Sequence, residues 1–522
     1  MQDYFETDVL VIGCGIAGGT AALELAEAGV AVTVITSAAE PEESNTYYAQ
    51  GGIIFRGPDD SSELLAQDIL RAGAGHSNPW AVKLLAEEGP KLVKKILVDK
   101  VAVPFDRDEK NNLATIREAA HSTNRILHAA DSTGRAIEIA LLNSLKKHPH
   151  VNLLTSHTAV DLLTPSHHSK NRLAVYEPNS CVGAYVLNQK QKKVYRYLSK
   201  RTILATGGLG QIYLRTTNPA GARGDGLAMA YRAGARVINC EFIQFHPTTF
   251  HHQQAPHFLI SEAVRGAGAK LVHANGKPFM QKYDPEWKDL APRDVVARSI
   301  GLEMLEMKVP NVYLDLHSHI SKNEILERFP GIYEQCLQYG VDITEELVPV
   351  VVGAHYFCGG VWVDEWGRTD IQDLYAVGEV SCTGLHGANR LGSASLLEGL
   401  VWGYRSANDI KANILKEPQP DADNYPSWKD PGTEMPDPVL IHQDMSSIQN
   451  IMWNYVGLIR TGSRLERALH ELHNLEIEIE EFYRKTFLTD ALIGLRNAVR
   501  SAIIVAAAAW KNKTNMGCHF RE

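Results

Sequence analysis

A glycine cluster that follows a short apolar run constrains the fold of this chain more than any other feature. Asp8–Ile12 (DVLVI) is mostly β-branched and apolar, as in a strand buried on both faces of a parallel sheet. It leads directly into Gly13–Gly18 (GCGIAG), and Gly19–Ala28 has the composition of a helix. Gly29 closes that helix, and Val30–Ile35 follows as a second strand. This order predicts a βαβ dinucleotide-binding unit.

Each glycine of the turn has a physical task. Gly13 permits the tight turn, Gly15 lets the backbone approach a pyrophosphate, and Gly18 lets the helix pack closely on the strand. The N-terminus of the helix favours the negative charge of a phosphate. Ser37 stands where an acidic residue would hold the ribose of NAD, so the sequence does not predict an NAD-type ribose contact.

Amino-acid composition and hydrophobic periodicity divide the rest of the chain into segments. A second buried strand, Arg201–Thr206, runs into Gly207-Gly208, and Gly224-Asp225-Gly226 opens an alanine-rich helix. Histidine and proline become more frequent after Phe242, and helical periodicity dominates Ser446–Trp510. We predict an α/β fold in which a Rossmann-like dinucleotide-binding domain is interrupted by an α+β capping domain and followed by a C-terminal helical bundle. The expected boundaries are 1–240 and 352–418 for the interrupted domain, 241–351 for the cap and 419–522 for the bundle.

Charge and cysteine usage limit the functional classes. The formal net charge of −9 gives no reason to expect nucleic acid or an anionic membrane as a partner, so any cationic site must be local. The seven cysteines form no Cys-x-x-Cys pair, which argues against a disulfide framework or zinc ribbon and favours a reducing cytoplasm. Met1–Thr7 does not resemble a secretory signal, and the apolar run Ala502–Trp510 is too short to cross a bilayer.

Five motifs together resemble the succinate dehydrogenase and fumarate reductase flavoprotein family. They are the glycine turn, Asn45–Gly52 (NTYYAQGG), His246-Pro247, Ala291–Asp294 (APRD) and Gly387–Arg390 (GANR). The resemblance covers nearly the whole chain up to Ala407, and the C-terminal bundle more loosely. It implies that the interrupted Rossmann-like domain is an FAD-binding domain.

The resemblance further implies that the FAD is noncovalent. Membrane-bound members carry a histidine that bonds to the flavin in the loop before Ala-Gln-Gly-Gly, whereas this chain has Ser44-Asn45-Thr46. The expected cofactor contacts are Gly13, Cys14, Gly15, Ile16, Ala17, Gly18, Ser37, Asn45, Thr46, Tyr47, Tyr48, Ala49, Gln50, Gly51, Gly52, Asp225, Glu379, Ser395 and Leu396.

The same resemblance points to a small dianionic substrate. His246, His355 and Arg390 match positions that bind its carboxylates, and Gln244 and Ser261 match flanking polar contacts. Taken singly, a histidine before a proline is more often a turn or core residue, and Arg390 is equally suited to a structural ion pair. Taken together in the family frame, we interpret all five as substrate-binding residues.

Glu118 separates two branches of the family. Dicarboxylate members carry an uncharged residue at this position, whereas members that oxidise L-aspartate carry a glutamate that faces the substrate ammonium group. From spacing alone, Glu118 is better explained as a solvated loop carboxylate paired with Arg117 or Arg125. With the resemblance, we interpret it as the ammonium contact.

The implied reaction is hydride transfer from Cα of L-aspartate to flavin N5, which gives iminoaspartate. The resemblance also implies that dioxygen or fumarate reoxidises the flavin, and that the product passes to quinolinate synthase in de novo NAD biosynthesis. Arg293 matches the residue to which the family assigns proton transfer. A guanidinium pKa above about 12 suits a clamp better, and the alternative is that aspartate loses its proton to water or enters as the free amine while Arg293 only orients it. On the resemblance, we predict Arg293 as the catalytic residue.

Two other functions stay open from the sequence. A soluble fumarate reductase or succinate oxidase would use the same cationic cleft, and a non-catalytic flavin-binding subunit would act through its helical bundle. The family pattern Ser-Arg-Gly-x-His is altered here to Asn515–His519 (NMGCH), so the role of this tail is undefined. Asp315-x-His317-x-His319 alternates like a strand with one polar face and has no third ligand at fitting spacing, so we expect no metal.

Overall fold

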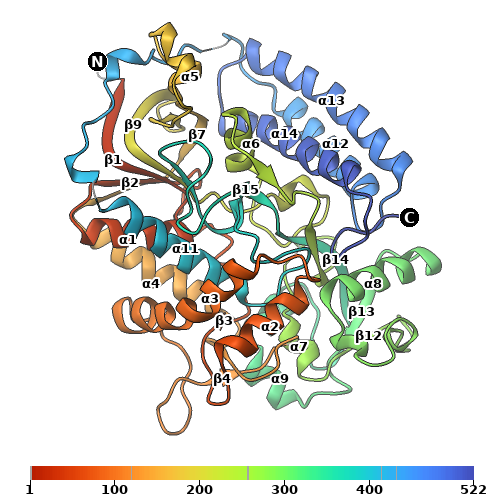
Figure 1. Ribbon diagram of the computed structural model, residues 1–522. Coiled ribbons are helices and arrows are strands. Elements are labelled where there is room, and N and C mark those ends of the chain that lie inside the picture. Colours follow the sequence, from red (N-terminus) through yellow and green to blue (C-terminus); the bar gives the residue numbers. More distant parts are fainter. Residues whose placement is uncertain (1–2, 119, 256–257, 413, 431) are drawn as a thin grey trace.

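The computed structural model describes residues 3–118, 120–255, 258–412, 414–430 and 432–522. Its first domain is built on a seven-stranded sheet in the order β6-β2-β1-β9-β8-β7, with β16 paired to β9 (Figure 1). The strands are β1 (Tyr4–Ile12), β2 (Val32–Ile35), β6 (Val151–Leu154), β7 (His157–Leu162), β8 (Gly183–Asn188), β9 (Lys193–Leu204) and β16 (Leu374–Ala376).

The parallel half of this sheet confirms the predicted βαβ unit. β2, β1, β9 and β16 run parallel in one register, with Leu10 between Thr33 and Thr202. Val9, Leu10 and Val11 are fully buried, as expected for a strand covered on both faces. α1 (Ile16–Glu27) begins earlier than the sequence suggested, because the glycine turn leads directly into its first turn.

Helices cover both faces of the sheet. α1 packs between α4 (Thr133–Lys147) and α11 (Ala394–Ile410). The approach of α11 is close enough that a Cβ at Gly403 would lie 2.5 Å from Ala17 O. The other helices of this part are α2 (Ser62–Ala72), α3 (Pro79–Leu92), α5 (Pro165–His168) and α6 (Asp225–Arg232). Two small sheets complete it, β3 (Ile53–Ile54), β5 (Ile126–Leu127) and β4 (Thr115–Ile116) in one, and β10 (Val237–Ile238), β15 (Gly360–Trp362) and β17 (Ser381–Cys382) in the other.

The inserted segment forms a second, antiparallel sheet in the order β11-β14-β13-β12. Its elements are β11 (Ile243–Phe250), α7 (Glu262–Gly266), β12 (Lys270–Val272), α8 (Arg293–Met307), β13 (Val312–Asp315), α9 (Lys322–Arg328), α10 (Pro330–Gln338) and β14 (Val348–Phe357). β14 crosses the boundary predicted at 351/352, so the cap sheet carries His355 into the neighbourhood of the first domain. In Figure 1 this part lies below the C-terminal helices.

Three long helices form the C-terminal layer, α12 (Pro438–Tyr455), α13 (Gly462–Lys485) and α14 (Asp490–Lys511). They lie together at the upper right of Figure 1, and α14 packs against α12, α13 and α6. Among the described residues, α14 is the one helix that is long and apolar enough to cross a membrane by length and composition. Because 72% of its most apolar window is buried inside the protein, packing in this layer accounts for its hydropathy.

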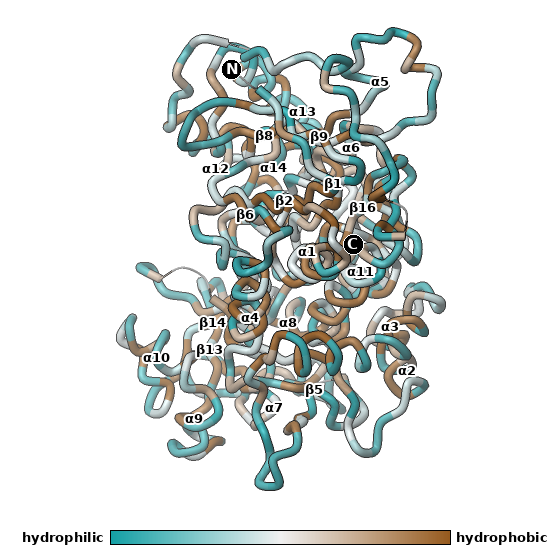
Figure 2. The backbone as a smooth tube through the Cα atoms, turned by 90° about the vertical axis from the view of Figure 1, so that its left-hand side faces the viewer, coloured by the Kyte–Doolittle hydropathy of each residue, from teal (hydrophilic) through white to brown (hydrophobic). Residues whose placement is uncertain are grey.

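The hydrophobic interior follows the strands and the inner helices. Figure 2 shows hydrophobic segments around β1, β2 and β16, and hydrophilic segments in outer loops such as the one at α5. One continuous core joins Leu10 of the first sheet, Val350 of the cap sheet and Ala502 of α14. The first domain, the cap and the C-terminal helices therefore share one hydrophobic core. A ligand cavity can form where these three parts meet.

Candidate active site

A cavity of about 600 Å³ is lined by the first domain, the cap and the start of α14. The predicted site residues that line it are Gly13, Cys14, Gly15, Ile16, Ala17, Ser37, Asn45, Thr46, Tyr48, Ala49, Gln50, Gly51, Gly52, Glu118, Asp225, His246, Ser261, Arg293, His355, Glu379, Arg390, Ser395 and Leu396. Gly18, Tyr47 and Gln244 are not among its lining residues. Segments that are far apart in the sequence therefore meet at one site.

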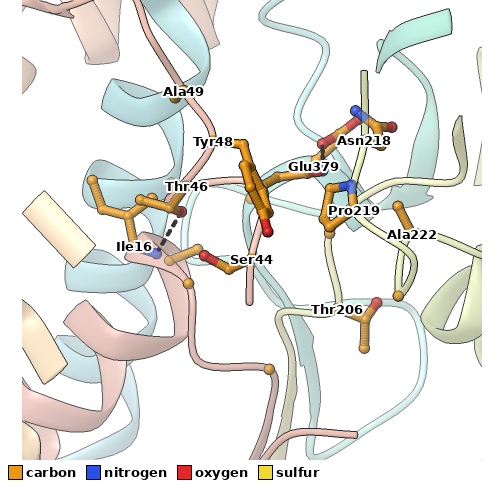
Figure 3. A pocket seen from close by; sticks show the side chains of 18 of the residues that line it. Ile16, Ser44, Thr46, Tyr48, Ala49, Thr206, Asn218, Pro219, Ala222 and Glu379 are labelled. Carbon is orange, nitrogen blue, oxygen red and sulfur yellow. Dashed lines mark hydrogen bonds between the residues drawn. The ribbon is translucent and has the colours of Figure 1, made fainter. Parts of the chain in front are cut away.

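The glycine turn between β1 and α1 forms one wall of the cavity. Gly13 has φ +109°, and a Cβ there would lie 2.1 Å from Ala205 O, so only glycine fits. A Cβ at Gly18 would lie 2.1 Å from Gly13 O, so Gly18 serves the packing of helix on strand instead of facing the cavity. Thr46 Oγ1 accepts a hydrogen bond from the Ile16 N–H at 3.0 Å (Figure 3). The positive end of α1 thus points at the cavity.

Tyr47 and Tyr48 separate in direction, although both were predicted to contact the cofactor. In Figure 3 the Tyr48 side chain lies between Ile16 on one side and Pro219 on the other. Tyr47 does not line the cavity, and its ring faces the Arg135 guanidinium at 5.6 Å. Of these two tyrosines, only Tyr48 lines the cavity.

Glu379 joins two walls of the cavity. Its Oε2 accepts a hydrogen bond from Asn45 Nδ2 at 2.8 Å, and its Oε1 accepts one from the Phe357 N–H at 2.9 Å. Burial raises the pKa of Glu379 to about 7. A Cβ at Gly208 would lie 2.2 Å from Glu379 Oε1, which explains the glycine that follows β9.

An ion-pair network brings α14 into the cavity wall. Arg223 Nη2 donates to Asp225 Oδ2 at 2.9 Å, and Arg223 Nη1 donates to Asp490 Oδ2 at 2.8 Å. Asn497 Nδ2 donates to the other oxygen of Asp225 at 3.0 Å. Asp490 lines the cavity and was missed by the sequence analysis. Its only local signal is its place in the first turn of α14, which says nothing about a partner 267 residues away.

Two neutral histidines mark the other end of the cavity. The rings of His246 and His355 lie 5.1 Å apart at 62°. Burial lowers the pKa of both well below the usual range, and nearby arginines lower it further. His246 Nδ1 accepts a hydrogen bond from the Thr248 N–H at 3.2 Å, so the proton of the neutral ring resides on Nε2. His355 Nδ1 lies 2.8 Å from Thr217 Oγ1.

Two guanidinium groups line the same end. Arg293 Nε donates to Glu262 Oε2 at 2.6 Å. Arg390 forms no ion pair with any carboxylate of the described residues; its Nη1 donates to Ser395 Oγ at 2.5 Å and its guanidinium lies 4.3 Å from the Tyr356 ring centre. Burial lowers the pKa of Arg390, with a further contribution from Arg293. The structural ion pair considered for Arg390 is absent from the described part of the chain. The Glu379 carboxyl acts on its charge only through space, so the guanidinium remains available to a ligand in the cavity.

Gln244 lies behind these arginines, fully buried and away from the cavity surface. Its Oε1 accepts hydrogen bonds from Arg293 Nη1 at 3.2 Å and from Arg390 Nε at 3.3 Å. Its Nε2 donates to Asn389 Oδ1 at 2.8 Å and to Arg390 O at 2.9 Å. The amide thus fixes the spacing of the two cations instead of presenting a polar group to a ligand.

Glu118 lies at the cationic end with only 8% of its surface exposed. Oε2 accepts a hydrogen bond from Ser393 Oγ at 2.7 Å, and Oε1 accepts one from the Gly52 N–H at 3.3 Å. Arg117 donates instead to His121 O at 2.8 Å. The interpretation of Glu118 as a solvated carboxylate is therefore wrong.

Arg125, the other partner considered for Glu118, is also engaged elsewhere. It pairs with Asp60 at 2.9 Å and with Asp68 at 3.1 Å. A Cβ at Gly392 would lie 3.1 Å from Glu118 Oε2 and 3.2 Å from Arg293 Nη2. The carboxylate and the guanidinium thus flank one glycine at the cationic end of the cavity.

The remaining predictions concern Ser261 and a metal. Ser261 lines the cavity and caps α7, with Oγ accepting from the Ala263 N–H at 3.3 Å.

β13 ends at Asp315, so the predicted strand through His317 and His319 is wrong. Both histidine rings turn back toward the Asp315 carboxylate, at 3.3 and 3.7 Å. Glu262, which pairs with Arg293, was missed because only the fold brings the two together.

Comparison with known sequences places both parts of the chain in flavoprotein families. Residues 8–396 match the FAD binding domain family, and residues 445–522 match the fumarate reductase flavoprotein C-terminal family. The chain is 42% identical to L-aspartate oxidase of Pseudomonas aeruginosa, over 100% of this chain and 96% of that protein. It is 44% identical to L-aspartate oxidase 1 of Ralstonia nicotianae, over 98% and 94% respectively. A chloroplastic L-aspartate oxidase of rice is 41% identical over 99% of this chain and 81% of that protein.

Solved structures agree with this placement. The flavoprotein chain of Escherichia coli quinol fumarate reductase superposes with a TM-score of 0.89 at 27% identity, covering 100% of this chain and 92% of that one. Sdh1 of Mycobacterium smegmatis, in complex with UQ1, gives 0.81 at 28% identity, covering 100% and 89%. The predicted fold, including the C-terminal helices, is thereby confirmed.

Proposed function

This chain belongs to the L-aspartate oxidases, within the succinate dehydrogenase and fumarate reductase flavoprotein family, and we propose that it oxidises L-aspartate to iminoaspartate by hydride transfer to N5 of FAD. The observation that carries the proposal is the charge pattern at one end of the cavity. Arg293 and Arg390 offer two guanidinium groups, and the Glu118 carboxylate lies within reach of the same space. L-aspartate carries two carboxylates and one ammonium group, which is the complement of this set.

The residues around the glycine turn fit a dinucleotide. Gly15 lines the cavity at the start of α1, where a pyrophosphate would meet the positive end of the helix. Thr206 Oγ1 and Gln50 Oε1 are buried polar atoms without a hydrogen-bond partner in the described protein, and both residues line the cavity. When bound, FAD supplies the hydride acceptor. We propose noncovalent attachment, because the loop at Ser44-Asn45-Thr46 contains no histidine.

The protein groups would bind and orient the substrate. Arg390 and Arg293 would each hold a carboxylate, and the neutral His246 would donate from Nε2. Glu118 would accept from the ammonium group. A guanidinium is a poor proton acceptor, and Arg293 is held by its ion pair with Glu262, so we assign it the orientation of Cα, with the substrate proton lost to water.

The electron acceptor, downstream step and compartment are further proposals. We propose dioxygen or fumarate as the acceptor; the likeness to quinol fumarate reductase supports fumarate, and dioxygen rests on the family resemblance alone. We propose that iminoaspartate passes to quinolinate synthase in de novo NAD biosynthesis, on the family resemblance alone. A cytoplasmic location is supported by seven cysteines that are all free and buried.

Anaerobic reduction of the bound flavin tests the proposed function. The yellow protein is mixed without oxygen with L-aspartate and, separately, with succinate, while the absorbance of oxidised flavin is followed. Bleaching by L-aspartate with little bleaching by succinate is the expected result. Bleaching by succinate alone would transfer the protein to the dicarboxylate branch, and bleaching by neither would contradict the proposed substrate class.

A further inference from the structure

The segment 515–522, here called the tail, folds back toward the substrate end of the cavity. A tight turn joins Met516 and His519, whose backbone groups exchange two hydrogen bonds of 2.9 Å. His519 is fully buried, with Nδ1 2.6 Å from Arg460 Nη1 and Nε2 3.1 Å from Asn512 O. Arg460 also exchanges backbone hydrogen bonds with Phe520 and Glu522. The tail is therefore anchored on both sides of the turn.

The turn presses Gly517 and Cys518 against the loop that carries Arg390. The Cys518 N–H donates to Ala388 O at 2.9 Å, and Cys518 Sγ donates to Asn389 Oδ1 at 3.3 Å. Gly517 has φ +50°, and a Cβ there would lie 2.5 Å from Ala388 O. No other residue fits between the tail and this loop without displacing one of them.

The tail also holds the cap helix that begins at Arg293. Arg298 Nη1 donates to Gly517 O at 3.0 Å, while its Nη2 pairs with Asp294 at 2.8 Å. Asp294 in turn accepts from Asn389 Nδ2 at 3.3 Å. One residue pair of the tail thus touches the loop of the first domain and the cap helix at the same time.

These contacts continue to the two substrate cations. Asn389 Oδ1, which accepts from Cys518, also accepts from Gln244 Nε2 at 2.8 Å. Gln244 Oε1 is the shared acceptor of Arg293 and Arg390. Gly517 and Cys518 do not line the cavity, so their influence on a ligand is exerted through position alone.

We propose that Gly517 and Cys518 are positioning residues that set the spacing of Arg293 and Arg390 and thereby the affinity for a four-carbon dicarboxylate or amino dicarboxylate. The inference rests on the proposed function, because it takes these two arginines as the carboxylate clamp. Gln244 joins the two arginines directly, and Asn389 joins the loop to Asp294 of the cap helix. The tail braces these joints from behind, since it bonds to the loop of the first domain and to the helix of the cap.

Gly517→Ala tests the proposal against a matched control. Gly340→Ala introduces the same positive-φ strain at φ +79°, with no neighbour within 4 Å of the added Cβ. The readouts are the KM for L-aspartate, the Kd for succinate from the flavin difference spectrum, the Kd for FAD and the melting temperature. For Gly517→Ala we expect both substrate constants to rise about tenfold with the FAD Kd unchanged. Gly340→Ala should leave all three constants as in the wild type.

Cys518 supplies a milder pair of variants in case Gly517→Ala does not fold. Cys518→Ala removes the donor to Asn389 and should raise both substrate constants about threefold, and Cys518→Ser should restore them. A lower melting temperature with unchanged constants in the folded variants would overturn the inference, because it would show a role in stability only. If the flavin of the wild type responds to neither L-aspartate nor succinate, the proposed function is wrong and the inference falls with it. If the wild type responds to both and the folded variants have the same KM and Kd as the wild type, only the inference is wrong.

Discussion

Glu118 Oε2 accepts a hydrogen bond from Ser393 Oγ at 2.7 Å, across 275 residues of sequence. A neutral hydroxyl, not a cation, is therefore the side-chain partner of this carboxylate. Its negative charge stays available to a ligand, and the Ser393 hydroxyl on Oε2 together with the Gly52 N–H on Oε1 fixes the direction of the carboxylate. This arrangement suits an ammonium group that arrives with the substrate.

Replacing Glu118 by Gln should separate the two reactions of this cavity. The amide keeps the shape but loses the charge, so kcat/KM for L-aspartate should fall about a hundredfold. Fumarate reduction by dithionite-reduced flavin should change less than about threefold, because fumarate has no ammonium group. Steady-state assays of both reactions on one preparation give the comparison. Equal losses in L-aspartate oxidation and fumarate reduction would mean that Glu118 does not select the substrate. Ser393→Ala should also lower L-aspartate oxidation more than fumarate reduction, by a smaller factor.

The pH dependence of ligand binding should reveal the neutral histidines. Because the pKa of His246 and of His355 lies well below the usual range, neither ring should gain a proton between pH 8 and pH 6. The two histidines should therefore add nothing to the pH dependence of the Kd for succinate, measured by flavin difference spectra. Glu379, whose pKa is about 7 in the same cavity, should titrate over this interval, so any gain in affinity that it causes should persist in His246→Asn. Ordinary histidines would become cationic over this interval and tighten dianion binding as the pH falls. A marked gain in affinity at pH 6 that disappears in His246→Asn would contradict the assignment.

Glu138 on α4 should make the stability of the protein pH-dependent. It is fully buried beside Cys14, forms no ion pair with a described residue, and burial raises its pKa well above 4.5. The folded state thus holds a proton that the unfolded state releases above pH 4.5. The stabilisation is complete below that pH and is lost as the pH rises toward the folded pKa, by about 1.4 kcal/mol per pH unit.

Glu138→Gln should flatten this slope, because the amide does not titrate. Denaturant unfolding at pH 5 and pH 8 measures the free energy of unfolding, and the variant should gain most over the wild type at pH 8. Glu6→Gln, at an exposed position on β1, is the control and should leave the slope unchanged. Parallel pH profiles for wild type and Glu138→Gln would show that the buried carboxyl is not the source.

Asp490→Asn should weaken FAD binding although the residue belongs to the C-terminal helices. It removes one charge of the pair that holds Arg223, and Arg223 in turn orients Asp225 at the cavity wall. We expect the Kd for FAD to rise about tenfold, measured by recovery of flavin fluorescence on dilution. Glu480→Gln serves as the control. It breaks the ion pair between Glu480 of α13 and Arg496 of α14, and neither residue lines the cavity. Similar FAD release from both variants would indicate general loosening of the helical layer.

Local patterns predicted what local physics determines. The glycine turn, the strand before it and the three C-terminal helices are set by backbone conformation and apolar periodicity, and the sequence contains both. The direction of Gln244 is a different matter. Gln244 and His246 are two residues apart on β11 and would point to the same side of a regular strand, but register shifts follow both residues. The irregularity turns Gln244 behind the arginines while His246 faces the cavity.

Contacts between segments that are far apart in the sequence could not be predicted either. Nothing near Asp490 predicts Arg223 as its partner, and nothing near Cys518 predicts Asn389. Such pairs exist only after the cap and the C-terminal helices have packed on the first sheet. Glu118 could be assigned from the family resemblance, but its burial and its bond to Ser393 could not, because both depend on that packing.

The wide spread of the cavity wall also has a consequence for biosynthesis. The wall draws on residues from Ile12 to Asp490, so the ribosome must release almost the whole chain before the cofactor can be enclosed. The N-terminal βαβ unit emerges first and must wait for β16, which is translated only after the complete cap. A stalled or prematurely terminated chain would therefore expose an open half-sheet with no flavin to fill it, and cofactor supply can act on this protein only late in its synthesis.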